Sequence, residues 1–305
     1  MTESEVAQPS VGADDRARDA AASAPTGSRK AILSVTDLKK YFPVKSSGLV
    51  RRTIGNVQAV DGVSFEVVEG SALGLVGESG CGKSTTGRLI TRLYEPTAGS
   101  MMFEGKDLAT LSNRAMTPMR KEVQMIFQDP YSSLNPRHTV GTIVGTPLRV
   151  HKVVPEKQVL NRVRELLEVV GLNPEHYNRY PNEFSGGQRQ RIGIARAIAL
   201  NPRVIVADEA TSALDVSLRS QMLDLMMNLQ DKLGLSYVFI SHDIGVIRYM
   251  CDRVAVMYRG RVVETGSTEQ VCDHPNHAYT QALLSAIPRP DPRARSMHKR
   301  HRYTA

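Results

Sequence analysis

The sequence predicts an α/β fold in which helices cover both faces of a parallel sheet. An apolar strand at residues 73–76 runs into a glycine-rich loop, and a helical pattern follows at 86–94. From residue 188 onward strands and helices alternate again. Between these parts, residues 129–190 combine helix-forming segments with proline and asparagine breaks, and we expect an inserted helical subdomain there.

The order of elements follows from apolar runs and turn residues. Residues 1–29 lack periodicity, so we expect a disordered leader followed by one domain over 30–288. A loop is expected at 45–55 and a turn at 104–107. The expected strands lie at 31–35, 57–60, 63–68, 100–103, 123–127, 204–207, 237–240, 254–257 and 261–263.

The clearest helix is expected at residues 155–170, where apolar residues recur every three or four positions. Pro155 fits its first turn and Gly171 fits its end. Its expected apolar face consists of Val159, Leu160, Val163, Leu166, Leu167 and Val170. Further helices are expected at 188–200, at 217–229 and after His242.

Composition limits the class of protein. The chain has 305 residues, of which 41% are hydrophobic, enough to bury a core. No apolar run approaches the roughly 18 residues of a membrane span, and no signal-peptide core opens the chain. Its 3 cysteines do not form a metal or disulfide pattern. We therefore expect a cytoplasmic protein that relies on partners for any membrane work.

The net charge of +8 is concentrated at the end of the chain. Residues 289–305 carry the basic side chains of Arg289, Arg293, Arg295, Lys299, Arg300 and Arg302 against the single acid Asp291. We expect this tail to be flexible and solvated, with contact to anionic lipid as the alternative. The rest is near neutral, so no nucleic-acid partner is predicted.

The glycine-rich loop matches the phosphate-binding pattern G-x-x-x-x-G-K-[ST]. Backbone N–H groups and the following helix start would bind phosphates, Lys83 would reach the β- and γ-phosphates, and Ser84 would ligate Mg²⁺. The alternative is a chance glycine-rich turn. The expected nucleotide-binding residues are Gly77, Glu78, Ser79, Gly80, Cys81, Gly82, Lys83, Ser84 and Thr85.

Polar residues follow three of the buried strands. Asp208 and Glu209 end the strand at 204–207, where Asp208 would hold Mg²⁺ and Glu209 would be the general base. Gln128 could touch both Mg²⁺ and the attacking water, and His242 could bond the γ-phosphate. Taken singly, these would be a helix cap, a loop residue and a structural histidine.

A second candidate anion site lies at Ser185, Gly186, Gly187 and Gln188, before a helical run. One chain cannot easily fold both sites around one γ-phosphate. We therefore expect a head-to-tail dimer in which each Ser185 loop closes over ATP bound to its partner. A capped helix start is the alternative interpretation.

Together these motifs resemble the ATP-binding cassette of membrane transporters, from about residue 32 to 289. The resemblance implies a P-loop, RecA-like core with an antiparallel β subdomain. It also places Asp215, in Ser212-Ala213-Leu214-Asp215, at the dimer seam. An aromatic residue near the start would stack on adenine: Phe42 is the candidate, with Tyr41 close behind and core packing as the alternative.

Two segments narrow the resemblance to ATPases of oligopeptide and dipeptide importers: residues 128–137 and 274–284, within an importer-type region at 266–288. The resemblance implies a second, usually different, ATPase chain, two permease subunits, a solute-binding protein and a place on the cytoplasmic face of the membrane. Two positions differ from the family pattern: Ala278 stands where a proline is common, and Ala210 stands where many cassettes have proline. Importers of nickel or glutathione, an exporter and a soluble nucleic-acid-associated cassette ATPase are the alternatives.

Overall fold

A six-stranded sheet forms the centre of the computed structural model, which describes residues 30–45, 53–212 and 214–286. The strand order is β10-β9-β3-β8-β7-β6. Strands β6 to β9 and β3 run parallel, and the edge strand β10 is antiparallel to β9. The bounds are β3 Ala72–Val76, β6 Val123–Ile126, β7 Val204–Asp208, β8 Ser236–Ile240, β9 Arg253–Tyr258 and β10 Arg261–Ser267.

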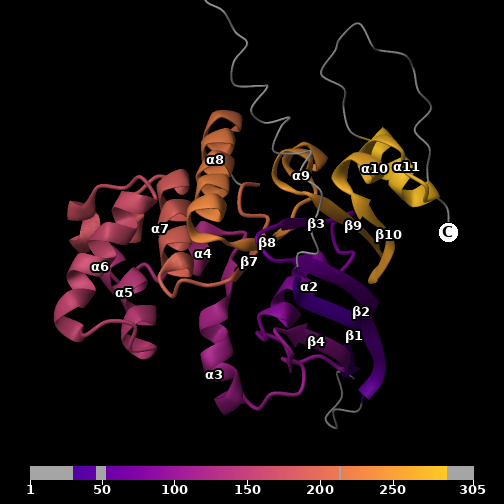
Figure 1. The fold of residues 1–305 in the computed structure, drawn as a ribbon, viewed down its shortest axis with the longest axis horizontal. Coiled ribbons are helices and arrows are strands. Elements are labelled where there is room, and N and C mark those ends of the chain that lie inside the picture. Colours follow the sequence, from indigo (N-terminus) through magenta and orange to yellow (C-terminus); the bar gives the residue numbers. More distant parts are fainter. Residues whose placement is uncertain (1–29, 46–52, 213, 287–305) are drawn as a thin grey trace, which may run out of the picture. The chain divides into compact units, whose positions relative to one another are not determined.

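Both faces of this sheet are buried along β3 and β6 to β9, because alternate residues of these strands enter different hydrophobic clusters. On β3, for example, Ala72 and Val76 belong to one cluster and Leu73 and Leu75 to the other. One cluster includes residues of α7 (Gly186–Ile198), α8 (Val216–Leu233) and α9 (Ile244–Met250). The other joins α2 (Lys83–Ile90) to the second sheet (Figure 1). The prediction of a covered parallel sheet is confirmed.

The second sheet is antiparallel, with the strand order β2-β1-β4-β5. Its strands are β1 Ala31–Lys45, β2 Thr53–Val68, β4 Ala98–Phe103 and β5 Lys106–Asp107. The two strands expected at 57–60 and 63–68 are one continuous strand, because Gly62 adopts φ +84° and the register shifts around it without ending the ladder. The loop expected at 45–55 was also too long, since β1 reaches Lys45 and β2 begins at Thr53.

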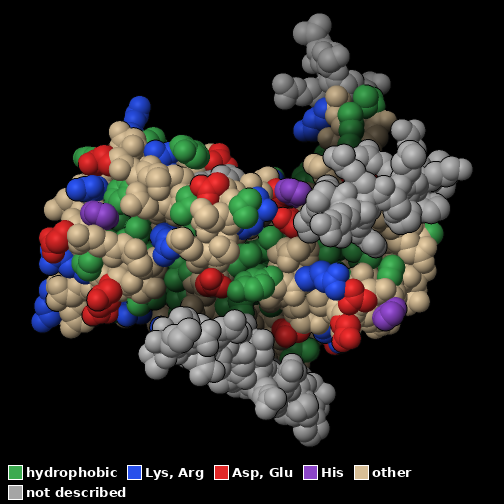
Figure 2. All heavy atoms as spheres, turned by 90° about the horizontal axis from the view of Figure 1, so that it is seen from above, with side chains coloured by type: hydrophobic (Ala, Val, Ile, Leu, Met, Phe, Trp, Pro, Cys, Tyr) green, Lys and Arg blue, Asp and Glu red, His purple; other side chains and the backbone are tan. Residues whose placement is uncertain are grey.

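Helices fill the segment between β6 and β7. They are α4 Pro130–Ser133, α5 Val140–Val150, α6 Glu156–Val169 and α7, with 3-10 turns at Pro174–Asn178 and Pro181–Glu183. α6 confirms the clearest predicted helix, although Leu160 is 40% exposed instead of core-facing. The helix α3 (Asn113–Glu122), which precedes β6, was not predicted. Charged side chains of both signs are interspersed over the helical end of the molecule (Figure 2).

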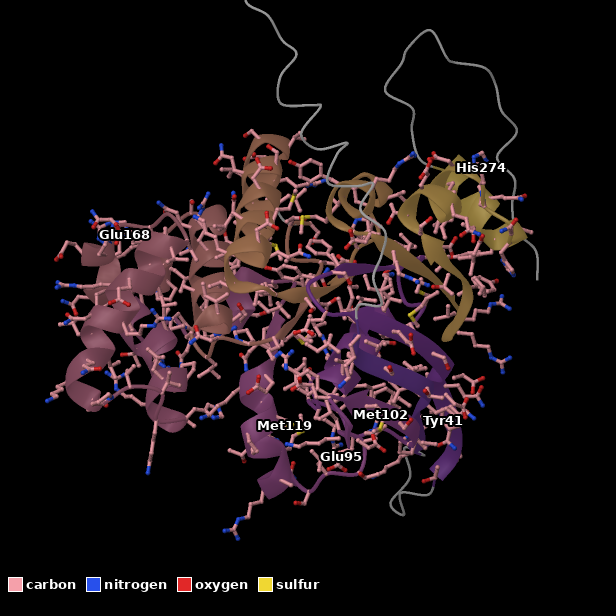
Figure 3. All side chains as sticks on the ribbon, viewed as in Figure 1. Tyr41, Glu95, Met102, Met119, Glu168 and His274 are labelled. Carbon is pink, nitrogen blue, oxygen red and sulfur yellow. The ribbon has the colours of Figure 1, made fainter. Side chains whose placement is uncertain are left out.

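The last described elements, α10 (Thr268–Asp273) and α11 (Ala278–Ser285), follow β10, and α10 packs on β9, β10 and α9. His274, labelled in Figure 3, lies between the two helices. Within the described ranges no helix is long and apolar enough to cross a bilayer. The expected leader at 1–29 and basic tail at 289–305 lie outside the described residues.

Candidate functional site

The glycine-rich loop connects β3 to α2 and depends on glycine at three positions. Gly77, Gly80 and Gly82 have φ of +149°, +80° and +109°, where side-chain-bearing residues are strained. A Cβ at Gly77 would lie 2.2 Å from the Met257 carbonyl oxygen, and one at Gly82 would lie 2.3 Å from that of Ala59. A Cβ at Gly80 would meet no atom within 4 Å. Gly77 and Gly82 therefore fix the loop against the protein, whereas Gly80 faces open space.

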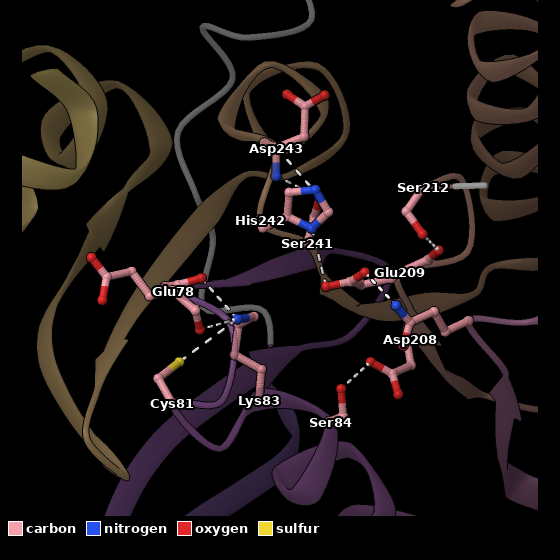
Figure 4. Close-up of polar contacts among 12 residues, drawn as sticks. Glu78, Cys81, Lys83, Ser84, Asp208, Glu209, Ser212, Ser241, His242 and Asp243 are labelled. Carbon is pink, nitrogen blue, oxygen red and sulfur yellow. Dashed lines mark hydrogen bonds and ion pairs between the residues drawn. The ribbon is translucent and has the colours of Figure 1, made fainter. Parts of the chain in front are cut away.

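Lys83 lies beneath the loop and is only 5% exposed. Its Nζ donates hydrogen bonds of 2.8 Å to the carbonyl oxygens of Gly77 and Glu78 and lies 3.7 Å from Cys81 Sγ (Figure 4). Burial raises the pKa of the Cys81 thiol, and the nearby Lys83 charge opposes that shift. Glu78, Ser79 and Gly80 are exposed, so the loop presents backbone to solvent above a buried cation. That arrangement suits an anion.

Ser84 and Asp208 meet beside the loop. Ser84 Oγ, in the first turn of α2, donates a 2.8 Å hydrogen bond to Asp208 Oδ1 at the end of β7. Burial raises the pKa of Asp208, opposed by this hydrogen bond and by the positive charge of Arg88. A hydroxyl and a carboxylate are the hard oxygen ligands that Mg²⁺ prefers, so this pair fits the predicted metal ligands.

Glu209 is the centre of a three-residue contact. Its Oε2 accepts a 2.7 Å hydrogen bond from Gln128 Nε2, and its Oε1 lies 3.1 Å from His242 Nδ1 (Figure 4). The carboxylate is 15% exposed and the imidazole 58%. Glu209 adopts φ +45°, and its N–H donates to the Ile240 carbonyl. The structure therefore brings together residues that follow β6, β7 and β8 in the sequence.

A salt bridge beside His242 was missed from the sequence. Arg219 Nη1 of α8 lies 2.8 Å from Asp243 Oδ2, and Asp243 caps α9 by accepting from the N–H of Gly245 at 2.9 Å. An acid directly after His242 and a cation four residues after Asp215 were the available signals. The bridge ties the His242 segment to the helix that Asp215 begins.

Ser185 and Asp215 cap helices. Ser185 is the N-cap of α7, and its side chain and that of Gln188 form a reciprocal capping box. Ser185 is exposed, whereas Gly187 is buried beside Leu218. Asp215 caps α8, and hydrogen bonds from the Leu218 N–H and the Ser217 hydroxyl hold its pKa below its usual range.

The two candidate aromatic residues lie in different surroundings on β1. The Phe42 ring packs edge-on against Tyr94 at 5.6 Å between centroids, and Tyr94 follows α2 at the end opposite the glycine-rich loop. The Tyr41 hydroxyl donates a 2.5 Å hydrogen bond to Asp61 Oδ1. An adenine contact from either residue stays a prediction.

A cavity of about 340 Å³ opens between β6 and the helical segment. Phe127, which precedes Gln128, contributes to its wall, and Arg196 of α7 donates a 2.7 Å hydrogen bond to the Ser133 carbonyl. Burial, aided by the charges of Lys121 and Arg120, lowers the pKa of His151 in the same wall. The cavity therefore adjoins the strand end that carries Gln128.

Comparison with known families gives two matches. The model described as "ABC transporter" matches residues 60–212, and that described as "Oligopeptide/dipeptide transporter, C-terminal region" matches residues 263–304. Among solved structures, the dimeric ATP-binding cassette MJ0796 with ADP and Pi has a TM-score of 0.68 at 28% identity, covering 77% of this chain and 98% of that one.

Curated relatives agree with these matches. The oligopeptide transport ATP-binding protein AppF of Bacillus subtilis is 52% identical, covering 85% of this chain and 79% of the relative. The dipeptide transport ATP-binding protein DppF of Haemophilus influenzae is 52% identical over 87% of this chain and 80% of the relative. The glutathione import ATP-binding protein GsiA of Escherichia coli O157:H7 is also 52% identical, but the match covers 42% of its length.

Proposed function

Because the chain belongs to the ABC transporter family, we propose that it is the ATP-hydrolysing subunit of an importer of oligopeptides or dipeptides. Family membership makes the chain an ATP-binding protein with ATPase activity. The observation that carries the catalytic part is the contact of Glu209 with Gln128 and His242 beside the phosphate loop. The peptide substrate is supported by the C-terminal match over residues 263–304 and by the named relatives.

Binding begins with the loop. Phosphate oxygens of ATP would replace the carbonyls of Gly77 and Glu78 as partners of Lys83, since both bonds lie directly under exposed loop backbone. Ser84, Asp208 and the Gln128 amide oxygen would hold Mg²⁺, and the ion would neutralise charge that develops on the phosphates. The Ser84–Asp208 distance of 2.8 Å keeps two of these groups adjacent.

Hydrolysis would use Glu209 as the general base. Its carboxylate is held from both sides, by an amide that can turn toward water and by an imidazole that can turn toward the γ-phosphate. Glu209 would accept the proton of the attacking water, with Gln128 orienting that water. Arg219 would position His242 indirectly, because its salt bridge to Asp243 holds the residue that follows His242.

A second cassette would complete the site. The exposed Ser185 hydroxyl and the first N–H groups of α7 would contact the γ-phosphate of ATP held by the partner. Asp215 would lie near the same seam, since it begins α8, which packs on α7. The cassette of similar structure is described as dimeric with ADP and Pi bound. The second cassette would be a different chain.

Closure of the two cassettes over ATP would be passed to two permease subunits, and a solute-binding protein would deliver the peptide to those subunits. We place the chain on the cytoplasmic face of the membrane, with the cavity beside Phe127 toward the permease. That cavity adjoins both Gln128 and α7, so closure at the nucleotide would reach it. Import of glutathione is the second candidate, favoured by the 52% identity to the glutathione import protein.

The test is purification of the chain from its own cells with its membrane partners. We expect two membrane proteins to co-purify and peptides to stimulate ATP turnover. Glu209→Gln should keep ATP binding and lose turnover about 10²- to 10⁴-fold, the range for a general base. Glu165→Gln, which removes an exposed carboxylate paired with Arg162, is the matched control and should turn over normally.

Two results would contradict the proposal. Normal turnover by Glu209→Gln would remove Glu209 as the base. Stimulation by glutathione but not by other peptides would support the second candidate, and recovery of nucleic acid in place of membrane proteins would exclude both.

A further inference from the structure

A tyrosine from the C-terminal helix reaches the phosphate loop. The N–H of Glu78 donates a 3.1 Å hydrogen bond to the Tyr279 hydroxyl, from a residue 201 positions later in the chain. Tyr279 is 2% exposed and belongs to α11, within the C-terminal region of the peptide-transporter type. None of the roles proposed above uses this contact.

The bond completes a clamp on one peptide group. The peptide that joins Gly77 to Glu78 has its carbonyl oxygen bound by Lys83 Nζ and its N–H bound by Tyr279. A peptide group is planar, so fixing both ends fixes its orientation. Lys83 also binds the next carbonyl, that of Glu78. The orientation of the Gly77–Glu78 peptide group and the position of the Lys83 ammonium under the loop are therefore linked.

Tyr279 is itself held firmly. Its ring packs against Tyr258 with 4.4 Å between centroids, and its N–H donates to His277 Nδ1 at 3.1 Å. Glu264 of β10 accepts from the N–H groups of Asn276 and His277 at 2.7 and 3.1 Å, which anchors the chain just before α11. Burial raises the pKa of Tyr279 to about 12, opposed by the hydrogen bond from Glu78, so its hydroxyl stays protonated at neutral pH.

We propose that Tyr279 is a positioning residue for nucleotide binding, through which α11 holds the Gly77–Glu78 peptide in the orientation that receives phosphate. The inference rests on the proposed ATPase function. It gives the C-terminal region a role at the nucleotide site of its own chain. Tyr279 acts on the loop and not on the reacting atoms, so affinity depends on it and the chemical step does not.

The test compares Tyr279→Phe with Tyr237→Phe in the full chain. Both variants remove one buried tyrosine hydroxyl, but Tyr237 bonds the Met226 carbonyl in the core, away from the loop. Loss of one neutral hydrogen bond should raise the dissociation constant for ADP about 2- to 10-fold in Tyr279→Phe and leave it unchanged in Tyr237→Phe. In the purified importer, KM for ATP should rise by the same factor while kcat stays within about 2-fold.

A second readout does not depend on nucleotide. Hydrogen exchange of the Glu78 amide in the ligand-free protein should be faster in Tyr279→Phe than in wild type and unchanged in Tyr237→Phe. Equal ADP affinity and equal Glu78 exchange in all three proteins would overturn the inference and leave the proposed function intact. Failure of the wild-type protein to bind ADP would instead overturn the proposed function and this inference with it.

Discussion

Two glycines of the phosphate loop should lose different amounts of unfolding free energy when each is replaced by alanine. At Gly82 (φ +109°), a Cβ would lie 2.3 Å from the Ala59 carbonyl oxygen, which is backbone and cannot turn away. Backbone strain of about 1–3 kcal/mol and overpacking of about 1–3 kcal/mol then add, so Gly82→Ala should lose about 2–6 kcal/mol of unfolding free energy. At Gly80 (φ +80°), no atom lies within 4 Å, and Gly80→Ala should lose only the strain of about 1–2 kcal/mol.

Gly80→Ala should affect ADP affinity more than it affects stability. Its Cβ would occupy the open space above the loop where phosphate is proposed to bind, so Gly80→Ala should lose ADP affinity while remaining folded. Urea unfolding of the ligand-free chain measures stability, and calorimetric titration with ADP measures affinity. Equal stability of the two variants would refute the argument from the Ala59 contact. Unchanged ADP affinity in Gly80→Ala would show that the open space is not the phosphate site.

Two further predictions follow from the same site. Asp208→Asn should raise the unfolding free energy of the ligand-free chain at neutral pH, because burial raises the folded-state pKa of Asp208 and so makes its charged form costly. The gain should be absent at acid pH and should appear as the pH rises through the folded-state pKa. Urea unfolding at a series of pH values measures it. A lower stability of the variant at pH 7 would contradict this reasoning. Ser185→Ala should cost about 1 kcal/mol of unfolding free energy, because it removes the N-cap of α7, and it should also lower ATP turnover. The control Ser112→Ala removes the N-cap of α3 and should show the stability loss alone. Equal ATP turnover in the two variants would exclude Ser185 from the site on the partner's ATP.

The local signals in the sequence predicted the central sheet and which polar side chains meet at its edge. Buried parallel strands are continuous apolar runs, so β3, β7 and β8 were visible, and the residues that follow parallel strands meet at one edge. That is why Glu209, Gln128 and His242 could be grouped before their contacts were known. The family comparisons confirm the identification as an ABC transporter ATPase.

The errors and omissions concern contacts between distant segments. The sequence predicts two strands in place of the long strand β2, because a glycine such as Gly62 is typical of a turn. In the structure, pairing with β1 continues on both sides of Gly62 and keeps β2 in one piece. Leu160 fits the apolar spacing of α6 but lies at the margin of the face that packs. The contacts of Tyr279 with Glu78 and of Arg219 with Asp243 join residues 201 and 24 positions apart, which no local pattern reports.

The two carbonyl bonds of Lys83 have a consequence for product release. The ammonium already has partners in the loop, so a nucleotide that bound as proposed would exchange one set of hydrogen bonds for another. The net gain is smaller than a phosphate meeting an unpaired buried cation would give. If ADP leaves as proposed, these carbonyls would again be the partners of Lys83, and the loop would keep its shape for the next turnover.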